Sequence, residues 1–223
     1  MTSVVAMLAV YCETQSQTDP LSGLVVGERP DPEPREGWEV VTLKAATLNH
    51  HDLFSLQGIG LPADRLPMIL GCDGAGIDAQ GREVILHSVI ATPGWSGDET
   101  FDPKRSLFSE VAQGTFSEKV LVPSANLVAK PEDMSWATAA ALPTAWLTAY
   151  RMLFTNAGVS PGSLVLVQGA GGGVATALIQ LGAAAGLRMW VTSRDPEKGS
   201  VPRSSAPRRC SSREPACPRR STP

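Results

Sequence analysis

The sequence predicts an α/β protein in which a module of short β-strands precedes a parallel β-α-β unit. Short apolar runs, separated by Pro- and Gly-containing breaks, fill the first half of the 223-residue chain. Further along, the composition becomes rich in Ala, Leu and Thr, and a glycine-rich turn then joins an apolar run to an alanine-rich run. We therefore expect a β domain over residues 1–125, an α/β domain over 126–199 and a separate tail over 200–223.

The composition is that of an ordinary soluble globular protein, with 43% hydrophobic and 18% charged residues. No apolar stretch reaches the roughly 18 residues that a membrane helix needs. The first basic residue is Arg29, so the apolar start lacks the positive region of a secretory signal. The four cysteines form no CxxC pair, which favours reduced thiols. These features predict a cytoplasmic protein without a membrane partner.

The charge is divided unevenly along the chain. Residues 1–199 carry 13 basic and 21 acidic side chains, a net charge of −8, whereas residues 200–223 carry six arginines and one acid, Glu214, a net charge of +5. An acidic body argues against nucleic-acid binding, because that affinity comes mostly from Lys and Arg on phosphates. The tail has basic residues but no aromatic side chains between them, so we expect no nucleic-acid partner.

Five apolar runs predict the strands of the first region, which suit a barrel or a sandwich. We expect these strands at residues 7–11, 24–27, 38–46, 83–90 and 116–122. The segment Thr92–Gln113 contains several turn-forming residues and is expected to be a long loop.

The second region begins with helical sequence over Trp136–Phe154. Ser135 can cap the first turn, because its hydroxyl can accept a hydrogen bond from a free backbone N–H. Pro143 lacks a backbone donor and obstructs the preceding turn, so two helices are expected rather than one.

A β-α-β unit is expected next. Leu164–Val167 is a continuous apolar run, typical of a strand buried on both faces, and Leu187–Thr192 is expected to be a second such strand. Between them, Val174–Ala185 predicts a helix that ends at Gly186. Residues 200–223 contain Ser, Pro, Arg, Ala and Cys but no large apolar residue except Val201, so we expect this tail to be disordered.

The glycine-rich turn is the strongest functional signal in the sequence. Glycine allows a tight turn and lets backbone N–H groups approach a pyrophosphate, while the following helix directs its positive end at the anion. The context of strand, turn and helix favours dinucleotide binding over a merely structural turn. The candidate binding residues of the turn are Gly169, Ala170, Gly171, Gly172, Gly173 and Val174.

The residues that follow the second strand indicate which dinucleotide is bound, NAD(H) or NADP(H). There an acidic residue would bind a ribose hydroxyl, and an arginine would accommodate a 2′-phosphate. This chain has Ser193 and Arg194, with Asp195 only afterwards and Lys198 adding positive charge. NADP(H) is therefore favoured over NAD(H); the alternative is that Arg194 and Lys198 are solvated surface charges.

Several motifs together resemble the medium-chain dehydrogenase/reductase superfamily. They are Gly114–Pro123, Ala139–Pro143, Leu147–Tyr150 and the glycine turn, and the likeness extends over residues 5–199. The chain is most similar to the zinc-independent quinone oxidoreductase and enone reductase branch. The resemblance implies a GroES-like β-barrel domain, the N-terminal part of a Rossmann domain, a site in the cleft between them, and usually a homodimer.

The resemblance also bears on metals. Zinc-dependent members carry a catalytic cysteine where this chain has Asn49, and a Gly-His-Glu run where it has Gly71–Asp73. We therefore expect no zinc, and Cys72 is expected to be a buried thiol that behaves as a small hydrophobe. His50 and His51 are expected to be ordinary polar residues of a turn near the cleft.

By resemblance, Asn49 and Asp52 lie near the nicotinamide side of the cleft, and Thr148 lies near the cofactor. Relatives often have a tyrosine where this chain has Phe54, so a phenolic proton donor is not expected there. The implied activity is transfer of hydride from NADPH to a quinone, an enone or a related carbonyl acceptor. Without a Lewis acid, a conjugated acceptor is easier to reduce than a simple ketone.

Family members continue past the second Rossmann strand, whereas this chain changes to its arginine- and proline-rich tail. We expect the tail to follow a frameshift and the truncated product to be weak or inactive, with its dimer in doubt. Two alternatives to the reductase stay open. One is a non-catalytic remnant or nucleotide-binding module, and the other is alcohol dehydrogenase-like activity.

Overall fold

The computed structural model describes residues 6–193 and 208–209. The chain forms two compact units, Met1–Thr144 and Ala145–Pro223. The boundary lies later than the expected one at residue 125, because the next two elements belong to the first unit. Strand β10 (Leu127–Ala129) pairs with β6 (Glu83–Leu86), and helix α2 (Trp136–Ala141) packs on β3 (Trp38–Thr47) and β5 (Asp73–Ile77).

The largest sheet of the first unit has five strands in the order β10-β6-β5-β3-β9, with β9 at Lys119–Pro123. All its neighbouring strands are antiparallel, and a bulge interrupts the β3–β5 register between Leu43 and Ala45. Val41 and Val122 are fully buried in its core. The strand expected over residues 38–46 is confirmed as β3, and the one expected over 116–122 is present as β9, which begins three residues later.

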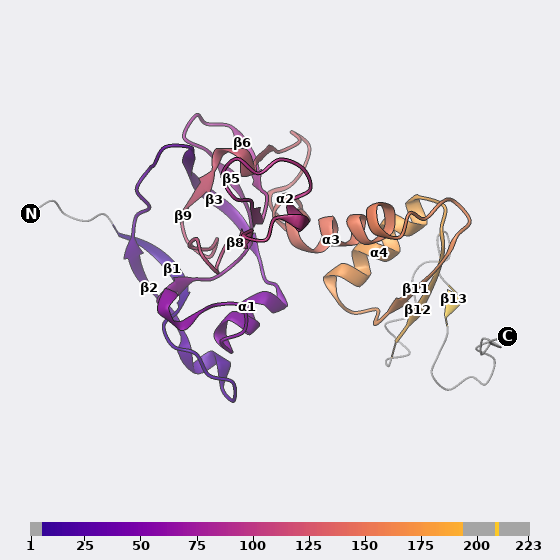
Figure 1. Ribbon diagram of the computed structural model, residues 1–223, viewed down its shortest axis with the longest axis horizontal. Helices are drawn as coiled ribbons and strands as arrows, with labels where there is room; N and C mark the ends of the chain where they lie inside the picture. Colours follow the sequence, from indigo (N-terminus) through magenta and orange to yellow (C-terminus); the bar gives the residue numbers. More distant parts are fainter. Residues whose placement is uncertain (1–5, 194–207, 210–223) are drawn as a thin grey trace, which may run out of the picture. The chain divides into compact units, whose positions relative to one another are not determined.

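A second sheet has the order β2-β1-β4, in which β1 (Ala6–Cys12) pairs along its whole length with β2 (Leu24–Pro30) (Figure 1). Strand β4 (Met68–Ile69) pairs only with the end of β1. The expected strand over residues 83–90 is instead two strands, β6 and β7 (Val89–Ile90), in different sheets. The Asn126 side chain bonds the carbonyl groups of His87 and Val89 and so holds the chain where it leaves β6.

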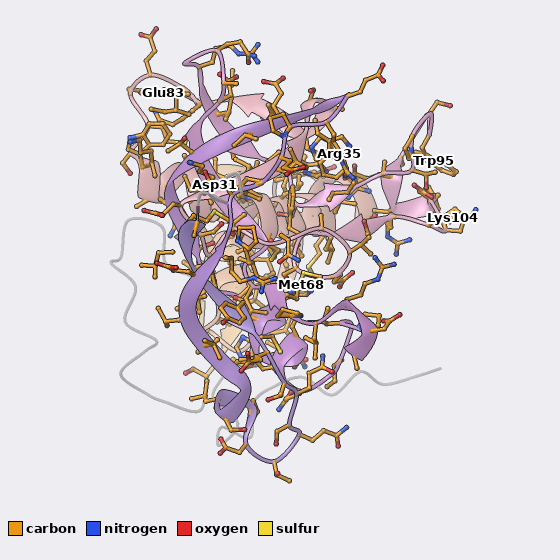
Figure 2. All side chains as sticks on the ribbon, turned by 90° about the vertical axis from the view of Figure 1, so that its left-hand side faces the viewer. Asp31, Arg35, Met68, Glu83, Trp95 and Lys104 are labelled. Atoms are coloured by element: carbon orange, nitrogen blue, oxygen red, sulfur yellow. The ribbon has the colours of Figure 1, made fainter. Side chains whose placement is uncertain are left out.

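The segment after β7 is largely a loop, as expected, but it contains a short strand, β8 (Ser106–Leu107), which pairs with β7. The loop also contains the 3₁₀ turn η3 (Glu99–Phe101). Its outer part carries Trp95 and Lys104 and projects from the body of the unit in Figure 2. A 2.5 Å contact between His87 Nε2 and Glu99 Oε1 joins it to the end of β6.

The first unit contains little helix. Helix α1 spans His50–Leu56, and three further 3₁₀ turns are η1 (Pro20–Gly23), η2 (Ala63–Arg65) and η4 (Ser124–Asn126). The expected cap of α2 is confirmed, because the Thr138 N–H donates to Ser135 Oγ at 3.1 Å.

The expected break at Pro143 is wrong. After α2 the chain stays helical through a π-helical segment, η5 (Leu142–Trp146), then α3 (Leu147–Tyr150) and a second π-helical segment, η6 (Arg151–Asn156). A widened turn accommodates a proline ring and its missing N–H without ending the helix.

The second unit contains the predicted β-α-β arrangement. Strand β11 (Leu164–Gln168) pairs in parallel with β12 (Arg188–Thr192), and α4 (Gly173–Ala184) connects them (Figure 1). Within the tail expected to be disordered, Arg208–Arg209 form a short strand, β13, parallel to β12. The other tail residues lie outside the described part of the chain.

Strand β11 is not buried on both faces as expected. Of its five residues only Val167 is buried, and Leu164 and Leu166 are 53% and 56% exposed. The alternation arises because α4 packs against β11 and β12 on one face, and no other described element covers the opposite face of β11. Among the described residues, no helix is both long and apolar enough to cross a membrane.

Candidate functional site

The glycine turn is held in place by the end of the neighbouring strand. Gly169 has a φ of +83°, a conformation that favours glycine. Its N–H and that of Ala170 donate to the Thr192 carbonyl at 3.2 and 3.1 Å, and the Gly169 N–H also lies 3.1 Å from Thr192 Oγ1. These two predicted binding residues therefore fix the bend with their N–H groups.

The next two glycines have no structural requirement within the described chain. A Cβ atom added to Gly171 or Gly172 would meet no atom within 4 Å, and neither residue has a positive φ. Gly173 is closer to its surroundings, since its added Cβ would lie 3.3 Å from the Ala145 side chain. Open space over consecutive glycines is what the close approach of a ligand to the backbone would require.

Helix α4 begins at the open side of this turn. Its N-cap is Gly172, which offers no side-chain cap, so the N–H groups of Gly173, Val174 and Ala175 have no partner in the helix itself. The Gly172 carbonyl accepts from both the N–H and the hydroxyl of Thr176, at 2.9 and 3.0 Å. The free N–H groups and the helix dipole together suit an anion.

The remaining predicted cofactor residues are spread over the second unit. Thr148 is an exposed residue of α3, and Ser193 directly follows β12. Arg194 and Lys198 lie outside the described residues.

In the first unit, Asp52 is a positioning residue. The Asn49 N–H donates to Asp52 Oδ2 at 2.7 Å, and the Gly71 N–H donates to Asp52 Oδ1 at 3.0 Å, so the carboxylate ties the start of α1 to the segment before β5. Burial raises the pKa of Asp52, although these two donors act in the opposite direction. Asp52 is buried with both oxygens engaged, and its place on the nicotinamide side stays a prediction.

A buried polar cluster is centred on Asp73, which the sequence did not single out as a functional residue. Its carboxylate accepts four hydrogen bonds: from Thr47 Oγ1 at 3.0 Å and Asn49 Nδ2 at 2.9 Å on Oδ2, and from Ser88 Oγ at 2.9 Å and Thr144 Oγ1 at 2.5 Å on Oδ1. We call these five residues the Asp73 cluster. Of its members, Asn49 is a predicted site residue, and Thr144 directly follows the Ala139–Pro143 motif.

Cys72 lies beside this cluster. Its Sγ is 3.5 Å from Thr144 Oγ1 and 3.6 Å from Asn49 Nδ2, and the side chain is buried. Burial, together with the neighbouring Asp73 carboxylate, raises the pKa of the thiol to about 12. Cys72 is therefore a protonated, buried thiol at neutral pH.

The paired histidines occupy the first turn of α1. His51 Nε2 lies 3.0 Å from Glu110 Oε1, and its Nδ1 lies 3.3 Å from Ser109 Oγ, so the ring joins α1 to the segment after β8. His50 is exposed and its ring contacts Phe54 at a centroid distance of 6.3 Å. Within the described part of the chain, no three His, Cys, Asp or Glu side chains form a group that could hold a metal ion.

A curled antiparallel β unit followed by a β-α-β unit with an open glycine turn is the arrangement found in two-domain dinucleotide-binding proteins. Curated relatives agree. The zinc-type alcohol dehydrogenase-like protein YogA of Leptosphaeria maculans is 34% identical over 193 residues, which are 78% of this chain and 53% of the relative. The acryloyl-coenzyme A reductase of Sulfurisphaera tokodaii is 30% identical over 196 residues, 82% of this chain and 58% of the relative.

Solved structures give the same result. An NAD-dependent alcohol dehydrogenase matches with a TM-score of 0.82 and 33% identity, over 94% of this chain and 64% of that one. The quinone oxidoreductase of Thermus thermophilus, solved also with NADPH, matches with a TM-score of 0.68 and 30% identity, over 92% and 59%.

The chain belongs to the medium-chain dehydrogenase/reductase superfamily, as its resemblance indicated. No protein-family model matches the chain. The chain spans about half the length of the first curated relatives it matches.

Proposed function

We propose that this chain binds a reduced nicotinamide dinucleotide at its glycine turn and supports reduction of a quinone, an enone or a related conjugated carbonyl compound. The observation that carries the proposal is the open space over Gly171 and Gly172 at the uncapped start of α4. Two relatives support the class of acceptor, since one is named a quinone oxidoreductase and another an acryloyl-coenzyme A reductase.

The turn fits the diphosphate of such a cofactor. Gly169 and Ala170 hold the bend on β12, which leaves the N–H groups from Gly171 to Ala175 to donate to phosphate oxygens. Each of these donors is fixed by the backbone, so little ordering is needed on binding. The bound nicotinamide would supply the hydride.

NADP(H) is proposed over NAD(H) on the sequence after β12. Arg194 and Lys198 would accommodate a 2′-phosphate, and no acidic residue stands between β12 and Arg194. The solved neighbours are divided on this point, because one is named as NAD-dependent and the other was solved with NADPH.

Zinc, which the names of several relatives imply, does not fit Cys72 and the residues of the Asp73 cluster. Cys72 is a single thiol, and within the described residues no three His, Cys, Asp or Glu side chains form a group that could hold a metal ion. Both oxygens of Asp73 already accept hydrogen bonds, and the Asn49 amide donates to one of them. We therefore derive no step through a metal.

The donors of the Asp73 cluster identify one group that could stabilise charge on an acceptor oxygen. Thr47, Ser88 and Thr144 each donate their single O–H to Asp73, so their oxygens offer only lone pairs to a neighbouring molecule. Asn49 has a second N–H, and the other contacts of its amide nitrogen are long, 3.5 Å to the Thr47 carbonyl and 3.6 Å to Cys72 Sγ. We assign Asn49 as the hydrogen-bond donor and water as the proton source.

The proposal is tested by titrating the purified chain with NADPH and NADH and by assaying NADPH oxidation with menadione. Gly171→Ala should weaken binding at least about tenfold, because the added methyl group obstructs the diphosphate. Gly27→Ala is the matched control, since its Cβ would make only ordinary contacts on β2, the nearest at 3.5 Å. Binding without turnover would favour the nucleotide-binding module, and no binding to either dinucleotide would refute the proposal.

A further inference from the structure

We propose that the first unit holds a second ligand site, a pocket of about 540 Å³ that binds a small molecule with an apolar body and one acidic group. It is formed by the β2-β1-β4 sheet, by β9 and by residues 106–113. This volume falls within the range of about 300–1,000 Å³ that small-molecule sites occupy. No residue of the glycine turn or of the Asp73 cluster lines this pocket, so the proposal does not depend on the oxidoreductase function.

The walls of the pocket are largely apolar. Met7 of β1, Ile69 of β4 and Val120 of β9 line it, and all three are almost completely buried. Trp38, at the start of β3, adds an aromatic ring that is only partly buried. An apolar or aromatic ligand body would bury its own surface and that of Trp38 against these side chains, which favours binding.

The charged side chains that line the pocket are all cationic: Arg29, Arg35, Arg65 and Lys119. Lys119 forms an ion pair with Asp31, which lies on the same strap between β2 and β3 as Arg35; both residues are labelled in Figure 2. The three arginines form no ion pair with any described carboxylate. Three of the four cations that line the pocket therefore have no ion-pair partner among the described residues.

Two of these guanidinium groups lie against aromatic rings instead of carboxylates. The Arg35 Cζ is 3.7 Å from the centre of the Trp38 ring, and the Arg29 Cζ is 5.1 Å from that of Tyr11. Stacking of this kind orients the planar group but leaves its N–H edge free to donate. A carboxylate or sulfonate could then be bound by paired N–H donors, which is the strongest interaction that arginine makes.

The probe for this site is 1-anilinonaphthalene-8-sulfonate, and N-phenyl-1-naphthylamine, which lacks the sulfonate, is its neutral counterpart. We expect saturable fluorescence enhancement with one sulfonate probe per chain, and binding of the neutral probe at least about tenfold weaker, since it leaves the arginines unpaired. Arg35→Gln and Arg65→Gln should each weaken the binding of the sulfonate probe by about tenfold. Lys44→Gln removes an exposed cation that does not line the pocket and should leave binding unchanged.

Two further experiments test whether the probe binds in this pocket. Ala112 lines the pocket, so Ala112→Trp should fill it and abolish binding of both probes, with Ala112→Leu as a milder variant if the first does not fold. Excess NADPH should not displace the sulfonate probe. The proposal would be overturned if NADPH displaced the sulfonate probe or if the two probes bound equally well. It would also be overturned if the arginine variants bound the sulfonate probe as the wild type does, or if a folded Ala112 variant still bound it.

Discussion

The amide Nδ2 of Asn49 lies 2.9 Å from Oδ2 of Asp73 and joins the start of α1 to the first residue of β5. This contact places a neutral donor against a carboxylate that is 1% exposed and has no basic partner among the described residues. Asp73 therefore depends on its hydrogen bonds for stabilisation, because a buried charge without partners is costly. The same contacts hold Asn49 in one orientation.

Replacement of Asp73 by Asn should destabilise the first unit by about 2–4 kcal/mol, because an amide group would face hydroxyl and amide donors where an oxygen now accepts. The measurement is urea unfolding followed by circular dichroism. Asp64→Asn, at an exposed position of η2, is the control and should change stability by less than about 0.5 kcal/mol. A loss for Asp73→Asn no greater than the control would show that the cluster contributes nothing to stability.

The raised pKa of Asp52 predicts how stability depends on pH. Burial places the folded-state pKa above the ordinary value of 3.8, so the folded protein binds this proton more tightly than the unfolded protein. The unfavourable contribution of ionised Asp52 is present above the folded pKa and is relieved as pH falls toward 3.8. As pH is lowered from 7 to 4, the free energy of unfolding of the wild type should therefore rise relative to that of Asp52→Asn. Urea unfolding measures both values, and a difference that stays constant or falls as pH is lowered would contradict this.

Cys72 should resist alkylation in the folded protein. With a pKa of about 12, its thiolate fraction at pH 8 is lower than that of a free thiol by about 10³-fold, and burial restricts access further. Iodoacetamide labelling of a Cys210→Ser/Cys217→Ser variant, read by peptide mass spectrometry, should modify Cys72 rapidly in 8 M urea and very slowly in buffer. Equal rates in the two conditions would contradict the buried, protonated thiol.

Alanine variants of Gly71 and Gly81 distinguish the cost of backbone strain from the cost of steric crowding. Both have positive φ values, +89° and +80°, but an added Cβ at Gly71 would lie 2.5 Å from the Phe116 ring and 2.6 Å from Thr115 Oγ1, whereas none lies near Gly81. Gly81→Ala should cost about 1–2 kcal/mol and Gly71→Ala about 3–5 kcal/mol. Similar midpoints of urea unfolding for the two variants would refute the crowding at Gly71.

The elements that depend on local pattern were predictable. A continuous apolar run, a glycine-rich turn and an alanine-rich run follow one another along the chain, so the β-α-β unit and its glycine turn were predictable from consecutive residues. Strands β4 and β5 were not predicted, because β4 has two residues and the Asp-Gly-Ala-Gly-Ile sequence of β5 has the composition of a turn. The π-helical passage at Pro143 was also missed, since proline usually ends a helix.

The sequence by itself determined the fold class, the superfamily and the glycine-rich turn between β11 and α4, because these follow from patterns of consecutive residues. Only the tertiary structure decided that Asp52 faces inward, that Thr47, Ser88 and Thr144 meet at Asp73, and that three arginines with no acidic partner among the described residues line an apolar pocket. Residues tens of positions apart in the sequence meet through strand pairing and packing, and no local periodicity encodes which side chains then face one another.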